Sequence, residues 1–427
     1  MISFAGIAHA EVPPFAFIAQ GSTLSLALDE NGTVWAWGSN YDGECGIPAS
    51  EGLEYVTRPV AIHGLDNVTS IDAGELFVIA LKKDGTVLTW GWSIFGDLGY
   101  VPNNTTYNQS REHFSPLPVP GLSDITGISA GQHFCVVLKS DGTVWTWGDN
   151  RYGQLGDGKQ VTIDDYYAGA HRAEPGMVVG LDNVTYVSAG PINAAAVKDD
   201  GTVWVWGANS PSLFGKAGEN SAGPLAITTP VQVKGLENVK EIKLGYAHAL
   251  ALKNDGTVWA WGDNSCGQLG VAGKEFSNTP VMVPGLSNVT QISAGEEHSV
   301  ALEGDGTVWT WGHNKYGQLG DGTTSNSYSP VKVQLPPIKA VSARGFNTMA
   351  LDYNGTIWMW GNNNYGQLGN GLSSGSMSSP AALQAAVQGP TWSGAPSQSR
   401  GDSTVLLAIL LIILALAVGI FIYMWKR

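Results

Sequence analysis

One short sequence recurs seven times along this 427-residue chain and constrains its fold more than any other feature. It reads Asn/Asp-Gly-Thr-Val-Trp-x-Trp-Gly or a close variant, and its opening glycine falls at Gly32, Gly85, Gly142, Gly201, Gly256, Gly306 and Gly355. Successive copies lie 53, 57, 59, 55, 50 and 49 residues apart. Periods of this size are typical of propellers and solenoids, so the repeat is the expected unit of folding.

Four strand signals, which are short β-rich runs bounded by Gly, Asp and Asn, can be marked in the repeat. In the sixth copy they lie at Gln291–Ala294, His298–Leu302, Thr307–Trp311 and Pro330–Val333. The Asp305-Gly306 pair between the second and third signals indicates a hairpin, because glycine supplies the positive φ of a tight turn. Four antiparallel strands repeated seven times predict an all-β fold, a seven-bladed β-propeller over residues 12–385.

Two tryptophans stand two residues apart in nearly every copy. Thirteen of the 16 tryptophans occupy these positions, and Leu88 is the exception. Side chains two apart on a strand project from the same face. A buried tryptophan hides roughly 150–250 Å² of surface, so we expect blade-on-blade stacking to cover these rings.

The two ends of the array predict how the ring closes. Residues 12–18 resemble residues 335–341 and should form the inner strand of the first blade. The fourth strand of the last blade is expected near Pro380–Gln384. Residues 1–11 leave two alternatives open, a remnant of a signal peptide or a strand that clasps the ring.

Two loop motifs are the most specific part of the repeat. They read Trp-Gly-Asp-Asn-Arg-Tyr-Gly-Gln-Leu-Gly-Asp-Gly at 147–158 and Trp-Gly-His-Asn-Lys-Tyr-Gly-Gln-Leu-Gly-Asp-Gly at 311–322. With the seven copies, they resemble the regulator of chromosome condensation repeat family from about Phe15 to Leu383. The resemblance implies a seven-bladed propeller. Some members of the family are guanine-nucleotide exchange factors for a small GTPase and bind chromatin, and a secreted bacterial relative inhibits β-lactamases.

The composition and the motifs exclude several functions. The net charge is −14 with 22 Lys+Arg, which disfavours nucleic acid as a partner because such binding depends on cations at phosphates. The motifs of zinc proteases, P-loops and Cys-x-x-Cys sites are absent, so we expect no catalytic residue, cofactor or metal. His248 and His298 share a position filled elsewhere by phenylalanine or asparagine, which indicates a packing role. Cys45 and Cys135 are expected in the core.

The C-terminal end predicts a membrane anchor. Residues 404–424 contain no charge, and at ~1.5 Å per residue these 21 residues are long enough for a hydrocarbon core of ~30 Å. We therefore expect one transmembrane α-helix at 403–425 after a flexible linker at 386–402. The basic tail at 426–427 favours a cytoplasmic C-terminus and an extracytoplasmic propeller. Sequons such as Asn67, Asn183 and Asn288 suit an exposed glycoprotein, although these three occupy one repeat position.

One rim of the propeller is the candidate binding surface. In a four-stranded antiparallel blade, the first-to-second and third-to-fourth loops share a rim, which we call the loop rim; the Asp-Gly hairpins share the opposite one, the hairpin rim. The third-to-fourth stretches are longest in blades 2, 3 and 4, and mixed aromatic and charged loops on a rigid frame are typical of recognition sites. From blades 2 and 3 come Tyr107, Arg111, His113, Phe114, Asp164, Asp165, Tyr166, Tyr167, His171 and Arg172. The first-to-second loops add Glu75, Gln132, His133, Tyr246, Glu296, Glu297 and Phe346.

These observations together favour a membrane-anchored, non-enzymatic propeller that binds a protein or glycan at the cell surface. Two alternatives stay open. A cytosolic propeller would suit a guanine-nucleotide exchange factor or scaffold for a small GTPase, and an extracellular one could inhibit an enzyme.

Overall fold

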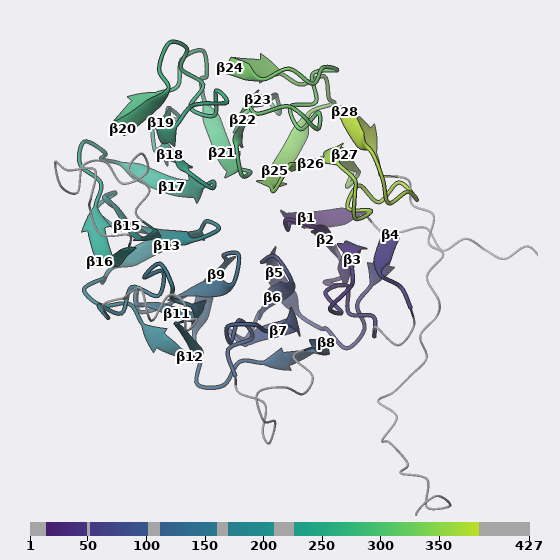
Figure 1. Ribbon diagram of the computed structural model, residues 1–427, viewed down its shortest axis with the longest axis vertical. Helices are drawn as coiled ribbons and strands as arrows, with labels where there is room; N and C mark the ends of the chain where they lie inside the picture. Colours follow the sequence, from purple (N-terminus) through teal and green to yellow (C-terminus); the bar gives the residue numbers. More distant parts are fainter. Residues whose placement is uncertain (1–13, 49–51, 101–111, 160–169, 209–225, 384–427) are drawn as a thin grey trace, which may run out of the picture. The chain divides into compact units, whose positions relative to one another are not determined.

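A computed structural model describes residues 14–48, 52–100, 112–159, 170–208 and 226–383. The chain divides into two units, residues 1–388 and 389–427, and the described residues all belong to the first. They form a ring of seven four-stranded antiparallel sheets around a central axis (Figure 1). The predicted seven-bladed propeller is therefore confirmed. The expected linker, transmembrane helix and basic tail lie outside the described residues, as do residues 1–11.

Each blade is built from four strands that are consecutive in the sequence. Blade 1 consists of β1 (Phe15–Gln20), β2 (Leu24–Asp29), β3 (Val34–Ser39) and β4 (Tyr55–Ala61). Blade 2 consists of β5 (Val68–Ala73), β6 (Phe77–Lys82), β7 (Val87–Trp92) and β8 (Glu112–Pro118). Blade 3 consists of β9 (Ile125–Ala130), β10 (Phe134–Lys139), β11 (Val144–Asp149) and β12 (His171–Met177). Blade 4 consists of β13 (Val184–Ala189), β14 (Asn193–Lys198), β15 (Val203–Ala208) and β16 (Ala226–Gln232).

The last three blades follow the same plan. Blade 5 consists of β17 (Val239–Leu244), β18 (His248–Lys253), β19 (Val258–Asp263) and β20 (Phe276–Met282). Blade 6 consists of β21 (Val289–Ala294), β22 (His298–Glu303), β23 (Val308–Gly312) and β24 (Ser327–Lys332). Blade 7 consists of β25 (Ile338–Arg344), β26 (Asn347–Asp352), β27 (Ile357–Asn362) and β28 (Ser376–Ala382). Within the ranges that the structure describes, no helix forms, and therefore none that could cross a bilayer.

The fourth strands begin earlier than predicted, and a bulge explains the difference. In blade 6, Ser327 pairs with Gly312 and Val331 with Thr310, so the register shifts around Pro330. Proline has no N–H to donate to the sheet and is tolerated at such a bulge. The proline therefore lies inside β24, whereas the sequence suggested that it starts the strand. In blade 7, β28 likewise begins at Ser376.

The two tryptophans of each repeat differ in burial. The second is fully buried in every blade, as Trp311 is, whereas most of the first ones, including Trp309, are only partly covered. The Trp311 indole N–H donates a 2.9 Å hydrogen bond to the backbone carbonyl of Gln268 in the loop of the preceding blade. The same carbonyl accepts a 2.7 Å hydrogen bond from the Ser299 hydroxyl, which also belongs to blade 6. Blade-on-blade stacking thus buries the second ring and joins it to its neighbour.

Blades 7 and 1 close the ring with the same interaction. The Trp37 indole N–H and the Ser25 hydroxyl both donate to the carbonyl of Gln367, at 2.9 and 2.7 Å. The backbone N–H of Phe15 adds a 3.2 Å hydrogen bond to the Gly355 carbonyl. The predicted inner strand of blade 1 is therefore confirmed as β1, and blade 7 packs against blade 1 through these hydrogen bonds.

The remaining repeat positions singled out in the sequence have packing roles. His248 and His298 are fully buried, and their Nε2 atoms lie 3.0 Å from hydroxyls of the next blade. Burial lowers the pKa of His248 to about 4 and that of His298 to about 3, so both rings are neutral at pH 7. Cys45 and Cys135 are buried free thiols, as expected.

The repeated sequon position has a backbone requirement of its own. Asn67, Asn183 and Asn288 are exposed and adopt φ of 55°, 53° and 53°. Asparagine tolerates this left-handed region better than most residues. The recurrence of asparagine at this turn is therefore explained without any modification.

The Trp311–Gln268 hydrogen bond can be tested against a neighbouring ring. We expect Trp311→Phe to lower the free energy of unfolding by at least ~1 kcal/mol more than Trp309→Phe, because only Trp311 loses an inter-blade hydrogen bond. The Trp309 indole N–H is buried and has no partner among the described residues, so it has no such bond to lose. Urea unfolding of both variants measures the difference. Equal losses would contradict a stabilising role for the inter-blade hydrogen bond.

Candidate binding rim

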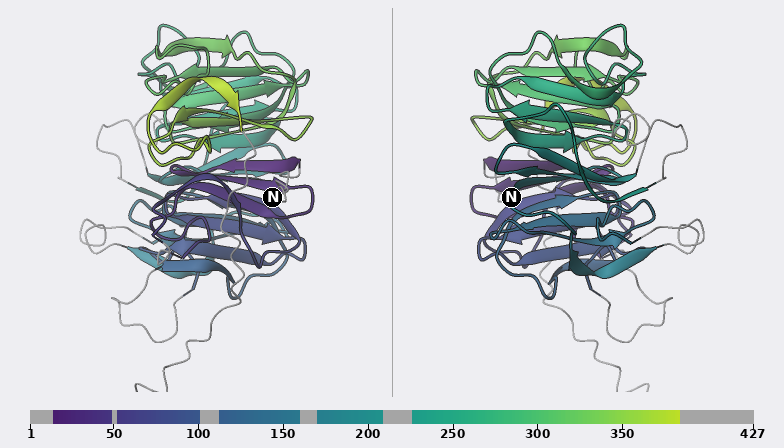
Figure 2. Two further views of the ribbon diagram at one scale, coloured as in Figure 1. Left: turned by 90° about the vertical axis from the view of Figure 1, so that its right-hand side faces the viewer. Right: turned by 90° about the vertical axis from the view of Figure 1, so that its left-hand side faces the viewer.

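The antiparallel order of each blade places the first-to-second and third-to-fourth loops on one rim. Figure 2 shows the blades from the side, with their strands running between the two rims. Of the predicted rim residues, Tyr107, Arg111, Asp164, Asp165, Tyr166 and Tyr167 lie outside the described residues. The structure places the other eleven in two groups, four in outer strands and seven in the first-to-second loops around the mouth of the central channel.

The outer-strand group is more involved in packing than predicted. His113 and Phe114 lie in β8, and His171 and Arg172 lie in β12. Arg172 donates a 2.8 Å hydrogen bond to the Thr146 carbonyl and forms a 3.1 Å ion pair with Asp157, so its guanidinium holds the blade together. Phe114 is half-buried, and burial lowers the pKa of His113. His171 is exposed and remains the member of this group best placed to meet a partner.

A belt of backbone hydrogen bonds joins neighbouring first-to-second loops around the channel mouth. The N–H of Glu75 donates to the carbonyl of Gln132 and that of Gln132 to Pro191, both at 3.0 Å. The N–H of Tyr246 donates to Glu296 at 2.9 Å and that of Glu296 to Gly345 at 3.0 Å. Because one blade fixes the loop of the next, the predicted mouth residues are held in a defined arrangement.

His133 is the most strongly perturbed group at the mouth. Its Nε2 lies 3.1 Å from a Glu75 carboxylate oxygen and its Nδ1 lies 3.7 Å from Asp97. Burial opposes the charged ring, but the neighbouring carboxylates of Asp97 and Glu75 outweigh it and raise the pKa of His133 to about 9. The hydrogen bond from His133 in turn lowers the pKa of Glu75. The two residues therefore form an ion pair at neutral pH.

Arg344 is the mouth residue that the sequence analysis missed. It ends β25 and replaces the glycine that follows Ala in blades 2, 3, 4 and 6. At those glycines a side chain has no room: a Cβ on Gly295 would approach the His298 ring to 2.1 Å. In blade 7 the strand continues one residue further and pairs Arg344 with Asn347, and Gly345 takes a φ of 53°. An alignment of the seven copies would have revealed this departure.

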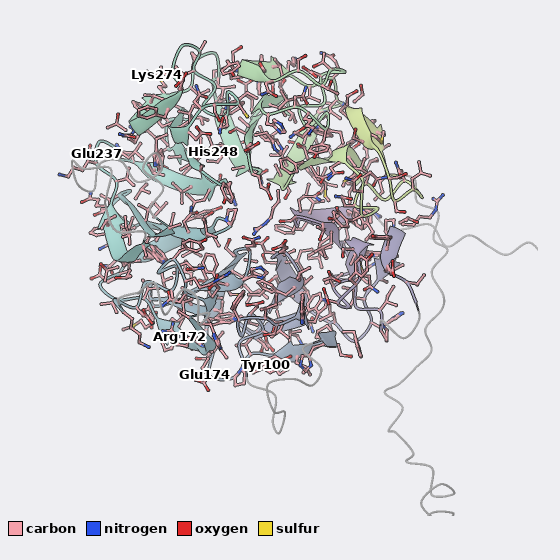
Figure 3. All side chains as sticks on the ribbon, in the orientation of Figure 1. Tyr100, Arg172, Glu174, Glu237, His248 and Lys274 are labelled. Carbon is pink, nitrogen blue, oxygen red and sulfur yellow. The ribbon has the colours of Figure 1, made fainter. Side chains whose placement is uncertain are left out.

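The Arg344 side chain spans the ring. Its Nη1 donates a 2.6 Å hydrogen bond to the carbonyl of Ala130 in blade 3, 214 residues away. Burial lowers the pKa of Arg344, and nearby Asp72, Glu296 and Glu75 oppose that effect. The ring centre is thus crossed by a charged side chain, and Figure 3 shows how closely side chains surround the axis.

A chamber of about 160 Å³ lies on the axis beside Arg344. All seven blades contribute to its wall, which includes Gln20, Asp72, Glu75, Lys243, Tyr246 and Glu296. Tyr246 is about half exposed beside it. The chamber offers charged and hydrogen-bonding groups around a narrow axial space, an arrangement suited to binding.

Two aromatic clusters lie among the loop-rim residues. Tyr41 and Tyr55 stack edge-to-face at 5.3 Å, and Tyr365 of the adjacent blade 7 lies 6.1 Å from Tyr55. On the other side of blade 7, Phe346 packs at 5.1 Å from Tyr316 and at 5.7 Å from His313. The loop tyrosine of the repeat supplies Tyr316 and Tyr365, a signal that could have added them to the predicted rim. Of the predicted residues, only Phe346 belongs to these clusters.

The described rim residues can form hydrogen bonds, ion pairs and ring contacts. Within the described ranges, no three His, Cys, Asp or Glu side chains are placed to hold a metal ion. Glu297, the remaining predicted residue, lies 3.7 Å from His313. Tyrosine is one of the residues enriched in surfaces that bind other proteins.

Known proteins share this architecture. Residues 167–401, more than half of the chain, match the RCC1-like domain, and regulator of chromosome condensation (RCC1) repeats match residues 15–44, 68–97, 125–154, 31–81 and 84–138. The ultraviolet-B receptor UVR8 of Arabidopsis thaliana is 31% identical over 59% of this chain and 54% of its own length. The human E3 ubiquitin-protein ligase HERC2 is 30% identical over 59% of this chain and 5% of its own. The matched part of this chain thus spans about half of the length of UVR8 and a far smaller share of the length of HERC2.

Solved structures agree on the fold. Yeast RCC1 (Prp20) bound to Kap60 superposes with a TM-score of 0.71 and 22% identity, over 90% of this chain and 89% of the other. Human WBSCR16 gives a TM-score of 0.67 and 23% identity, over 78% and 85%. At these identities the likeness concerns the fold alone.

The His133–Glu75 ion pair predicts a pH dependence of stability. The pKa of His133 is about 9 in the folded protein and ~6.5 in an unfolded chain, so its stabilising contribution is complete below pH 6.5 and is lost as the pH rises through 9. We expect His133→Gln to reduce the loss of stability between pH 6 and pH 9.5 by roughly 1–2 kcal/mol. Urea unfolding at both pH values measures it. His63→Gln, at an exposed histidine on the hairpin rim, is the control and should follow the wild type.

Proposed function

This chain belongs to the RCC1-like domain family, and we propose that it is a non-enzymatic binding module whose loop rim holds a protein partner. The observation that carries the proposal is the unequal chemistry of the two rims. The loop rim bears the tyrosine clusters, the His133–Glu75 pair and the axial chamber. An aromatic and charged surface on a frame fixed by inter-blade hydrogen bonds meets the usual requirements of a protein interface.

The hairpin rim has a simpler explanation. Its turns repeat Asp-Gly-Thr, and the aspartate caps the turn, as when Asp255 accepts a 3.0 Å hydrogen bond from the backbone N–H of Thr257. Asp141 and Asp305 make equivalent hydrogen bonds to Thr143 and Thr307. Residues that recur in these turns because the backbone requires them do not help the protein to distinguish one binding partner from another. The hairpin rim is therefore explained by its turns, which leaves the loop rim as the candidate binding surface.

Related propellers support a protein rather than a glycan as the ligand. The structure of yeast RCC1 was determined with Kap60, and a second structure of the yeast protein was described with its binding to Gsp1p and histones. These partners are properties of that protein. They show that a propeller of this fold can use its surface to bind proteins, which favours the same use here.

The proposal includes a membrane anchor. The uncharged stretch 404–424 supports a transmembrane helix at 403–425, and the basic tail 426–427 supports a cytoplasmic C-terminus. In this topology the propeller faces away from the cytoplasm and meets its partner at the cell surface. The opposite topology would favour an exchange factor or scaffold for a small GTPase, and a soluble extracellular target would favour an inhibitor.

The rim assignment can be tested with a photo-crosslinking residue in the full chain. We expect p-benzoylphenylalanine at position 246 or 41 to give a discrete protein adduct in intact cells, because both tyrosines are exposed on the loop rim. The matched control is position 353, an exposed tyrosine on the hairpin rim. Adducts at 353 alone would place the partner on the wrong rim for this proposal. Adducts that disappear after deglycosylation of the partner would favour a glycan.

The topology can be tested separately. An epitope tag inserted at Asn104, in the long loop of blade 2, should bind antibody on intact cells if the propeller is extracytoplasmic. A tag placed after Arg427 is the control and should require permeabilisation. Labelling of the Asn104 tag only after permeabilisation would contradict the cell-surface topology and favour the GTPase alternative.

A further inference from the structure

A second cavity, which we call the hairpin-side cavity, lies on the ring axis. Its volume is about 510 Å³, within the range of about 300–1,000 Å³ that is typical of small-molecule sites. Every inner strand contributes to its wall. Thr126 and Thr185, which are exposed at the hairpin-rim ends of β9 and β13, lie on that wall, whereas Arg344 at the loop-rim end of β25 does not. The cavity is therefore reached from the hairpin rim.

The wall of this cavity is uneven because one position of the inner strands varies in size. Its seven residues each pair with the next-to-last residue of the second strand, and all of them line the cavity: Phe17, Ser70, Gly127, Tyr186, Glu241, Gln291 and Ala340. The three consecutive inner strands β13, β17 and β21 carry long polar side chains at this position. The other four inner strands carry small residues there, apart from Phe17 in β1.

Gly127 opens a recess in the wall between blades 3 and 4. Because no side chain occupies this position, Leu138 of β10 and Val187 of β13 also line the cavity. Among the wall residues that the structure describes, Leu138 is the one that comes from a second strand. Val187 is 8% exposed, whereas its equivalents in blades 1, 2, 5, 6 and 7 are at most 5% exposed. The recess therefore presents apolar side chains to the cavity.

The fold itself does not require a glycine at position 127. A Cβ added there would lie 3.4 Å from the Leu138 Cβ and 4.0 Å from the Val187 Cγ2, which are ordinary contact distances. The φ of Gly127 is not in the left-handed region. Glycine weakens the interior of a strand and often marks a place where a ligand approaches the backbone closely. The open recess therefore explains this glycine better than the backbone does.

Phe17 adds an uncovered aromatic ring to the same cavity. Its side chain is 37% exposed, although it lines the interior of the ring of blades. The equivalent residues of the two adjacent inner strands are small, Ser70 in β5 and Ala340 in β25. Aromatic rings pair favourably in stacked or edge-to-face arrangements. Phe17 thus offers a surface to a ligand that contains a ring.

The charged groups of the hairpin-side cavity are already engaged. Lys243 lies 3.9 Å from Glu241 Oε1 and 5.4 Å from the centre of the Tyr186 ring. Asp72 accepts a 2.9 Å hydrogen bond from the backbone N–H of Ala130. Among the described wall residues, these are the charged side chains, and each has a partner. A charged ligand would lose its hydration without gaining a free counter-charge, so the wall suits a neutral one.

We propose that the hairpin-side cavity binds a small neutral aromatic molecule, whose ring lies between Phe17 and the Gly127 recess. The Lys243 ammonium has three donors and only a 3.9 Å ion pair, so it can donate a hydrogen bond to an amide or hydroxyl substituent of the ligand. This site lies at the opposite end of the axis from the loop rim. It is independent of the proposed function and adds a second kind of ligand to it.

The first test uses the full chain and three probes of the same shape. Benzamide, benzoate and benzamidinium differ in charge, and a ligand-observed NMR titration measures the affinity of each. We expect benzamide to bind about fivefold more tightly than either ion, because the wall offers no free counter-charge. Tighter binding of an ion would overturn the neutral ligand. The absence of saturable binding for all three probes would overturn the site.

Substitutions at two wall positions locate the bound probe. Gly127→Val should weaken benzamide binding about tenfold, because its side chain occupies the recess. Phe17→Ser, which copies the residue of β5, should weaken it about fivefold through loss of the ring contact. Tyr353→Ser is the control, since it removes an exposed aromatic ring at a turn of the hairpin rim, and it should have no effect. Unchanged affinity in both wall variants would overturn this location.

Gly127→Ala separates the role of the recess from that of the fold. The added Cβ fits, and alanine restricts the unfolded chain more than glycine does, so we expect the melting temperature to stay the same or to rise. Benzamide should nevertheless bind more weakly than to the wild type. A lower melting temperature would show that the fold needs this glycine, and would overturn its role in the site. Crosslinks at positions 41 and 246 should persist in this variant, so the loop-rim proposal is tested separately.

Discussion

The ring depends on a backbone carbonyl that accepts the buried indole N–H of the next blade, as Glu44 does from Trp90 and Gln154 from Trp206. In the Gly-Gln-Leu-Gly loops of blades 5, 6 and 7, the glutamine carbonyl also accepts a hydroxyl from the next blade, as Gln268 does from Ser299. The indole reaches this carbonyl only when its ring is fully buried. Burial of the ring therefore also fixes the position of one blade relative to the next. Because Gln367 accepts the same two bonds from blade 1, the interaction that joins neighbouring blades also joins the last blade to the first.

Much of this fold could be predicted from the sequence because the information is local. The strand signals and the Asp-Gly hairpins predict a four-stranded blade, and the seven copies of the repeat predict the number of blades. The two tryptophans could not be told apart, because their burial depends on where the neighbouring blade lies. The start of β24 was also misplaced, since proline signals a strand boundary locally but is accommodated at a bulge once the partner strand is present.

The candidate site was predictable only where it follows from topology. Placing Glu75, Tyr246 and Glu296 at the mouth required knowing which loops share a rim, and the structure agrees. An alignment of the copies could have singled out Arg344, but not its contact, because its hydrogen bond joins residues 214 apart across the ring. The outer-strand residues show the converse error: the sequence predicts Arg172 in a loop, yet it lies in β12 and its hydrogen bonds hold it in the blade.

The cross-ring contact of Arg344 also affects symmetry. Seven similar blades around an axis would present a ligand with seven nearly equivalent orientations. A single arginine reaching from blade 7 to Ala130 of blade 3 defines one diameter of the ring and removes that degeneracy. A molecule that binds on the axis therefore meets a surface that differs at every rotation about that axis, so it can be bound in a single orientation.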